Sequence, residues 1–130
     1  MMNEHTAKAF DIDLQELTRK VAEMGGLAEK GVADAIGALV RRDVELARRV
    51  IDTDVTIDAL QREIEEKSVL TIARRQPMAI DLRDVVGALR VCNDLERIGD
   101  LAKNIAKRVS ALSGDFQSVE LAIAESIPTL

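Results

Sequence analysis

The sequence contains no tryptophan and no tyrosine, and only two phenylalanines among its 130 residues. Sheets depend on aromatic and β-branched residues, so this deficit favours helices over a β-sandwich or barrel. Few aromatic side chains also weigh against binding of single-stranded nucleic acid, which relies on base stacking. The formal net charge of −5 weighs against duplex DNA, which requires a basic surface. We therefore expect no nucleic-acid partner.

Cysteine is almost absent, since Cys92 is the single one and no intramolecular disulfide can form. A reduced cytoplasmic setting is the simplest expectation, with Cys92 as a small buried apolar residue. No stretch approaches the roughly 20 apolar residues of a membrane span, and no secretory signal is visible at the N-terminus. We expect no insertion into a membrane.

Helical periodicity is what the sequence has in abundance. Its 47% hydrophobic and 32% charged residues are typical of strongly amphipathic elements. Apolar spacings of three and four predict three long helices, over residues 12–40, 44–75 and 81–111. The cap-forming run Asp52-Thr53-Asp54 suggests a break within the second helix. Short connections make consecutive helices antiparallel, so we expect an all-α, antiparallel three-helix bundle.

The ends of these helices carry recognisable signals. Asp43 and Asp81 are the expected caps of the second and third helices, and Gln76-Pro77 ends the second. Turn chemistry at Ser113-Gly114-Asp115 ends the third, and a short fourth helix is expected near the C-terminus, up to Ile127. We predict a flexible tail over residues 1–11, which includes His5, and a three-helix unit over residues 12–112. Residues 113–130 are predicted to be a linker or the start of a further repeat.

One apolar stripe runs along the third helix, formed by Ala88, Val91, Leu95, Ile98, Ala102, Ile105 and Val109. Glu96 and Asp100 lie four residues apart, so they are neighbours on the helix surface. Each is about 160° from Ile98 around the helix. We therefore expect these two acids on an outer face.

A second acidic pair, Asp54 and Asp58, lies on the second helix, on a face about 100° from its apolar stripe. The second and third helices turn near residue 78, so residues whose numbers add to about 156 should lie level. This count places both acidic pairs at the same height. The predicted metal ligands are Asp54, Asp58, Glu96 and Asp100, with Asn104 and Glu65 as further candidates. Converging carboxylates favour a hard cation such as magnesium, manganese or iron, and zinc less so.

The acidic residues also allow interpretations that need no metal ion. They are also typical of two solvated acidic faces, each pair costing a few tenths of a kcal/mol, and Arg62 or Arg97 could neutralise them. No nucleophile with a neighbouring base and no glycine-rich phosphate loop is visible. A ferritin-like di-iron centre requires Glu-x-x-His motifs, and His5 is the only histidine. We expect a protein that is not an enzyme.

Three segments resemble the PhoU family of bacterial phosphate regulators. They are residues 75–83, residues 94–106 and the Asp54-x-x-x-Asp58 motif. The resemblance spans most of residues 10–112. It implies tandem three-helix bundles whose acidic motifs hold surface metal ions, variously iron, zinc, magnesium or manganese. These motifs correspond here to Asp54 with Asp58 and to Glu96 with Asp100.

The resemblance also implies a function. Family members are cytoplasmic, often dimeric, and repress phosphate uptake and the phosphate-starvation response. They contact the ATPase subunit of the phosphate ABC transporter and a PhoR-type sensor histidine kinase. The alternative is a generic helical interaction or metal-buffering module without phosphate signalling. Because members are nearly twice this length, apolar surface should be exposed here, and we expect the chain to form a homodimer.

Overall fold

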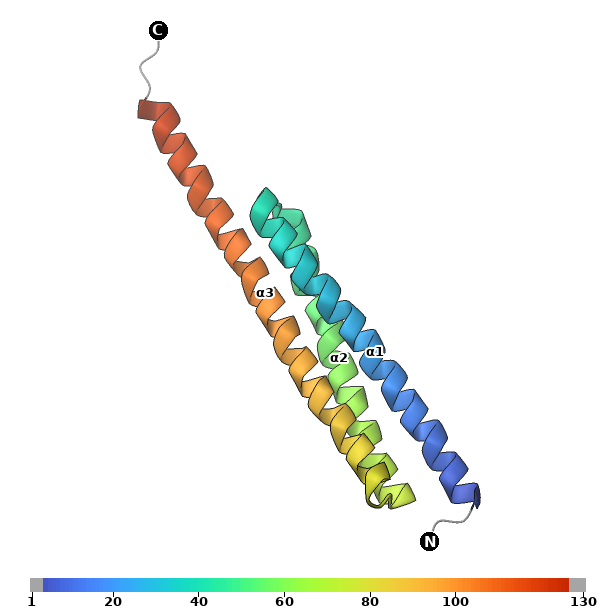
Figure 1. Ribbon diagram of the computed structural model, residues 1–130. Coiled ribbons are helices and arrows are strands. Elements are labelled where there is room, and N and C mark those ends of the chain that lie inside the picture. The colour runs from blue at the N-terminus through green and yellow to red at the C-terminus, as the bar shows by residue number, and fades with distance from the viewer. Residues whose placement is uncertain (1–3, 127–130) are drawn as a thin grey trace.

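Three helices form the regular structure of residues 4–126, the part of the chain that this computed structural model describes. They are α1 (Glu4–Arg41), α2 (Val44–Arg75) and α3 (Ile80–Ser126). Each helix contacts the other two, and consecutive helices run in opposite directions (Figure 1). The predicted all-α, antiparallel three-helix bundle is confirmed. Within residues 4–126, no helix is both long and apolar enough to cross a membrane.

The ends of α2 follow the predicted signals. Asp43 is the N-cap, and its Oδ1 accepts a hydrogen bond of 3.0 Å from the Leu46 backbone N–H. At the other end Gln76 adopts a left-handed conformation with φ of 48°, and its N–H donates to the Ile72 carbonyl. Pro77 follows and cannot continue the helix. Asp43 and Gln76-Pro77 were therefore correctly identified as helix boundaries.

The start of α1 and the middle of α2 differ from the prediction. Helix α1 begins at Glu4, eight residues before the predicted start, and Phe10 is fully buried in the core. Burial of this side chain stabilises turns that the polar sequence alone would leave frayed. Helix α2 continues without a break, and the Thr53 hydroxyl donates to the Arg49 carbonyl within the helix (2.8 Å). Asp54 is part of its buried face rather than a cap.

Helix α3 also extends beyond its predicted limits. It begins at Ile80, so Asp81 lies in its first turn rather than capping it. It then runs through residues 113–115 without a turn and ends at Ser126. The prediction of a short fourth helix is therefore wrong, because residues 118–126 continue α3. Ile127 lies outside the described residues. Figure 1 shows this end of α3 projecting beyond the connection between α1 and α2.

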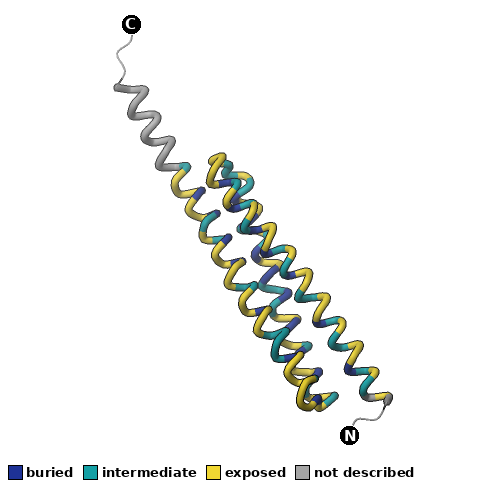
Figure 2. The backbone as a smooth tube through the Cα atoms, viewed as in Figure 1, coloured by how far each residue is buried: buried dark blue, intermediate teal, exposed yellow. Residues whose placement is uncertain are grey.

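The buried face of α3 is rotated from the predicted stripe. Ala102 and Val109 of the stripe are buried as predicted, but Val91 and Ile98 are 47% and 40% exposed. Cys92, Gly99 and Ala106 are also buried. These three small residues recur every seven positions and face α1 and α2, which allows the helices to approach closely. Buried residues follow the inward sides of the three helices (Figure 2). The rotation moves the neighbouring acids closer to the core than expected.

Ion pairs connect α1 to α2 along one edge of the bundle. Lys67 lies 2.6 Å from Glu16 and 3.7 Å from Asp13, and Arg75 lies 3.0 Å from Asp13. The Lys67 ammonium holds the pKa of Glu16 below its usual value through a hydrogen bond and its charge. Lys20 forms a similar pair with α2. These charges on α1 are therefore matched by opposite charges on α2 in the observed register.

Candidate functional site

Helices α2 and α3 lie close together at Gly99. A Cβ built on Gly99 would lie 3.3 Å from Asp54 Oδ1 and 3.2 Å from Ile57 Cδ1. Only glycine leaves room for such an approach without moving these neighbours. Ile57 and Gly99 are residues whose numbers add to 156, so the heights counted from the sequence are confirmed.

Asp54 is buried at this contact, with 3% of its surface exposed. Its Oδ2 lies 3.3 Å from Lys103 Nζ, and its Oδ1 has no hydrogen-bond partner among the described residues. Burial raises the pKa of the Asp54 carboxyl, the Asp58 carboxylate raises it further, and Lys103 opposes both effects. The expected outer-surface position is therefore wrong for Asp54. Its buried, unsatisfied oxygen requires an explanation, since such atoms are rare.

The other three acids surround Asp54 at lesser depth. Asp58 and Glu96 are half-buried, and Asp100 is exposed. Burial raises the pKa of Glu96, and the charge of the Asp100 carboxylate and a hydrogen bond with it raise it further. Asp58 and Asp54 also raise this pKa, so the four carboxyl groups lie within electrostatic reach of one another. We call Asp54, Asp58, Glu96 and Asp100 the acidic cluster.

Lys103 is the basic partner that the sequence interpretation missed. It follows Ala102, the residue counted as level with Asp54, so its position near that carboxylate was predictable. The two arginines considered instead, Arg62 and Arg97, are exposed and form no ion pair among the described residues. Lys103 places an ammonium group beside the buried carboxylate and neutralises part of the charge of the cluster.

The fit of a metal ion to this cluster is partial. The donors are all oxygen atoms and Asp54 Oδ1 is unsatisfied, which suits a hard cation. In the described residues, however, no group of three or more histidine, cysteine or acidic side chains is arranged to hold one. Of the further candidates, Asn104 is exposed, and Glu65 acts on the pKa of Cys92. Lys103 is paired with Asp54 Oδ2, so the oxygen left for a cation is Oδ1.

Cys92 has the environment expected of a structural residue. It is completely buried, and its Sγ lies 3.7 Å from Met24 Sδ. Burial raises the pKa of the thiol, and the nearby charges of Glu65 and Glu96 raise it further. Because the thiolate is the reactive form, burial and the raised pKa both favour the less reactive thiol.

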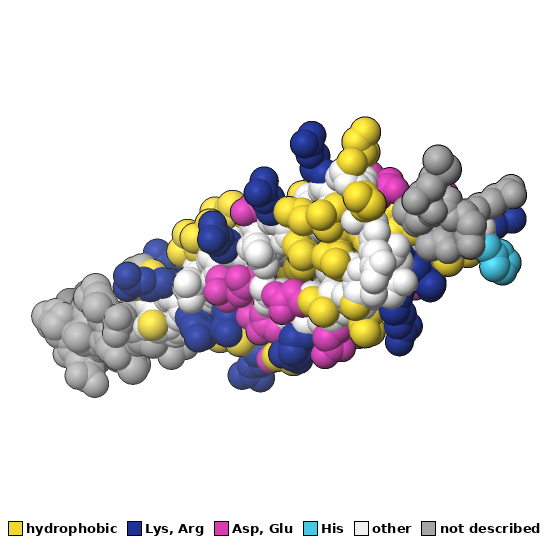
Figure 3. Space-filling view, turned by 90° about the horizontal axis from the view of Figure 1, so that it is seen from below, with side chains coloured by type: hydrophobic (Ala, Val, Ile, Leu, Met, Phe, Trp, Pro, Cys, Tyr) yellow, Lys and Arg dark blue, Asp and Glu magenta, His cyan; other side chains and the backbone are white. Residues whose placement is uncertain are grey.

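Figure 3 shows acidic side chains gathered beside a patch of hydrophobic ones on a single face of the molecule. Several large apolar residues of α3 are exposed, among them Val91, Ile98 and Leu101.

The comparisons with known proteins agree with this geometry. The family model described as "PhoU domain" matches residues 21–109, which include the whole acidic cluster. The chain belongs to the PhoU domain family. The resemblance carried by the acidic motifs is therefore confirmed.

Similar PhoU proteins extend beyond this unit. The chain is 54% identical over 114 residues to the phosphate-specific transport system accessory protein PhoU homolog of Rhizobium meliloti (strain 1021), which covers 88% of this chain and 48% of the relative. It is 52% identical to the homolog from Caulobacter vibrioides (strain NA1000 / CB15N), covering 86% of this chain and 49% of that one. The chain thus spans about half the length of the curated relatives it matches.

A solved PhoU structure has the same fold. The crystal structure of PhoU from Pseudomonas aeruginosa superposes with a TM-score of 0.79 at 40% identity. The match covers 82% of this chain and 51% of that one. The three-helix bundle therefore corresponds to about half of a longer PhoU chain.

Proposed function

We propose that this PhoU domain is a non-enzymatic adaptor that represses phosphate uptake and phosphate-starvation signalling. It acts in the cytoplasm between the ATPase subunit of the phosphate ABC transporter and a PhoR-type sensor histidine kinase. The observation that carries the proposal is the similarity to phosphate-specific transport accessory proteins, 54% identical over 114 residues in one case. The absence of a nucleophile paired with a base from the acidic cluster supports a binding role.

The mechanism is occupancy of a partner surface. A rigid helical face that binds one conformation of a kinase or transporter more tightly than another shifts the partner's conformational equilibrium toward the bound form. The size of the shift is set by the difference in affinity for the two conformations. The continuous helices and the interhelical ion pairs of α1 and α2 supply such rigidity. No chemical step is needed, so the domain regulates by binding alone.

A direct test uses this 130-residue chain with the purified transporter ATPase and the cytoplasmic part of the sensor kinase. Saturable binding to either partner in biolayer interferometry, together with repression of phosphate uptake in cells lacking the full-length regulator, supports the proposal. A chain that binds neither partner contradicts it and favours a generic helical interaction or metal-buffering module.

We also propose that the acidic cluster holds a divalent or iron cation when the protein is loaded. Asp54, Asp58, Glu96 and Asp100 would supply the oxygen ligands, and the cation would neutralise their mutual repulsion. Asn104 and Glu65 would join only after side-chain movement. The unsatisfied Oδ1 of Asp54 supports this proposal.

Elemental analysis of purified protein after dialysis against magnesium, manganese, iron or zinc tests the cation. The variant combining Asp58→Asn with Asp100→Asn should lose the bound metal. Glu66→Gln with Asp84→Asn, both exposed acids outside the cluster, is the matched control and should keep it. Equal metal content in all three proteins would rule out the cluster as the site.

A further inference from the structure

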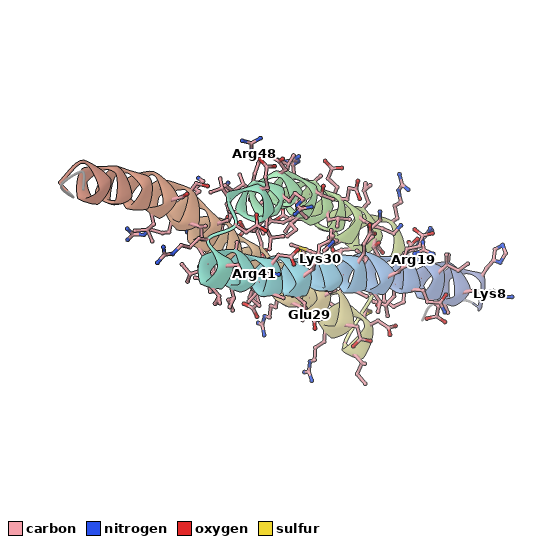
Figure 4. The ribbon with its side chains drawn as sticks, turned by 90° about the horizontal axis from the view of Figure 1, so that it is seen from above. Lys8, Arg19, Glu29, Lys30, Arg41 and Arg48 are labelled. Atoms are coloured by element: carbon pink, nitrogen blue, oxygen red, sulfur yellow. The ribbon has the colours of Figure 1, made fainter. Side chains whose placement is uncertain are left out.

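Lys103 is the basic partner of the acidic cluster. Its Nζ lies 3.3 Å from Asp54 Oδ2, and its side chain is 30% exposed. Basic residues on the other edge of the bundle pair with acids between α1 and α2 instead. Figure 4 shows further basic side chains, such as Lys8, Arg19 and Arg41, along α1, a helix that supplies no member of the cluster. The charge of Lys103 therefore acts on the cluster from within the contact of α2 with α3.

The ion pair makes the two oxygens of Asp54 unequal. Oδ2 faces the ammonium group, whereas Oδ1 has no hydrogen-bond partner among the described residues. Gly99 carries no side chain, and a Cβ built on it would lie 3.3 Å from Oδ1, so this glycine keeps space open beside the oxygen. Because only 3% of Asp54 is exposed, its carboxyl group cannot turn into solvent. One oxygen is held, and the other is left for a ligand.

Asp54 is also the centre of the cluster. Burial, and then the charges of Asp58 and Asp100, raise the pKa of its carboxyl group. Burial and Asp100 raise the pKa of Glu96 most, and Asp54 adds to that shift. Its carboxyl group thus interacts with the other three, and it is the member best placed to join two cations bound among them.

The number of cations depends on how many oxygens Asp54 can offer. Two-metal sites hold their ions roughly 3.5–4 Å apart. A carboxylate bridges such a pair by giving one oxygen to each ion. With Oδ2 held by Lys103, Asp54 has only Oδ1 to give. The ion pair therefore removes the bridging ligand that a second cation would need.

The balance of charge leads to the same number. Four ionised carboxylates carry four negative charges, and Lys103 cancels one of them. A single divalent cation then leaves one negative charge, whereas a second would make the site positive. Without Lys103, two divalent cations would match the four carboxylates. One lysine thus separates a site for one ion from a site for two.

We propose that Lys103 restricts the acidic cluster to a single divalent cation, by holding Asp54 Oδ2 and leaving Oδ1 as the oxygen that this carboxylate gives to the ion. The inference rests on the cation site proposed above. It adds how many ions that site holds and names the residue that sets the number.

The test loads the 130-residue chain with Mn²⁺ alone and counts bound ions by elemental analysis and isothermal titration calorimetry. The wild-type chain should bind one ion. Lys103→Met should bind about two, and the first should bind about tenfold or more tightly, because a nearby positive charge is gone. Electron paramagnetic resonance should show the hyperfine pattern of an isolated ion in the wild-type chain and a spin-coupled pair in the variant.

Two substitutions serve as controls for the charge and position of Lys103. Lys103→Arg keeps a cation beside Asp54 and should bind one ion. Lys107→Met removes an exposed lysine one turn further along α3 and should also bind one ion, with wild-type affinity. Circular dichroism reports whether each variant is folded. Lys103→Ala, which has a high helix propensity, is a second uncharged variant and should bind about two ions.

The outcomes separate this inference from the cation site on which it rests. A wild-type chain that binds a spin-coupled pair overturns the restriction and leaves the cation site standing, and this measurement needs no variant. Folded Lys103→Met or Lys103→Ala chains that bind one ion overturn it as well. A gain of an ion in Lys107→Met would assign the effect to general surface charge. Absence of bound Mn²⁺ from every protein removes the cation site itself.

Discussion

Replacing Gly99 by alanine tests the close approach of α2 and α3 at the acidic cluster. The new Cβ would lie 3.2 Å and 3.4 Å from Ile57 Cδ1 and Cγ2, and 3.3 Å from Asp54 Oδ1. Both neighbours are buried, at 3% exposure each, so they cannot turn into solvent to relieve the contact. Overpacking of this kind costs about 1–3 kcal/mol. The higher helix propensity of alanine returns about 1 kcal/mol.

The net expectation for Gly99→Ala is a loss of up to about 2 kcal/mol in the free energy of unfolding. Gly87→Ala is the matched control in the same helix, because nothing lies within 4 Å of its new Cβ. It should gain about 1 kcal/mol from propensity alone. The two variants should therefore differ by about 1–3 kcal/mol.

Urea unfolding followed by circular dichroism at 222 nm measures both values, in the presence of a chelator so that no metal contributes. If Gly99→Ala gains as much stability as Gly87→Ala, the two helices do not approach as closely as described. The burial of Asp54 against α3 would then lose its structural basis.

Three further changes probe the same region. Lys103→Met removes the only cation paired with buried Asp54 among the described residues and should lower the free energy of unfolding in urea by about 1–3 kcal/mol. This is less than the cost for a fully buried pair, because Lys103 is partly exposed. Adding Asp54→Asn should recover much of this loss, and no recovery would argue against the pair. Glu96 has a raised pKa, so the folded state binds its proton more tightly and stability falls as pH rises from the usual value of 4.5 through that raised pKa. Glu96→Gln should therefore stabilise the chelated protein at pH 7.5 but not below pH 4 in thermal melts, and equal effects at both values would contradict the shift. Cys92→Ser buries a hydroxyl and should lower stability by about 1–3 kcal/mol, against a smaller loss for Cys92→Ala.

The hairpin of α2 and α3 was predictable because its signals are local. Asp43 and Gln76-Pro77 act through their own backbone hydrogen bonds and ring geometry, so their effect does not depend on the rest of the fold. Once the turn is located, a helical rise of about 1.5 Å per residue fixes which residues lie level. This is why Asp54 could be placed beside the third helix without coordinates.

The rotation of α3 could not be predicted from its own pattern. Apolar side chains cover more than one side of this helix, so both the row containing Ile98 and the row containing Gly99 satisfy helical periodicity. The bundle buries the row of small residues because they let three helices approach closely. Asp54 shows the same limit, since its polarity predicts a cap or a surface position, and only packing of the turns around it keeps α2 continuous.

The sequence by itself determined the helical class, the two tight connections, the family and the level at which the acidic motifs meet. Each of these follows from short-range preferences or from counting along a regular helix. The tertiary structure alone decided which side of α3 is buried, and that Asp54 lies inside with Lys103 beside it. These features depend on contacts between residues far apart in the chain, whose free energies outweigh local preference.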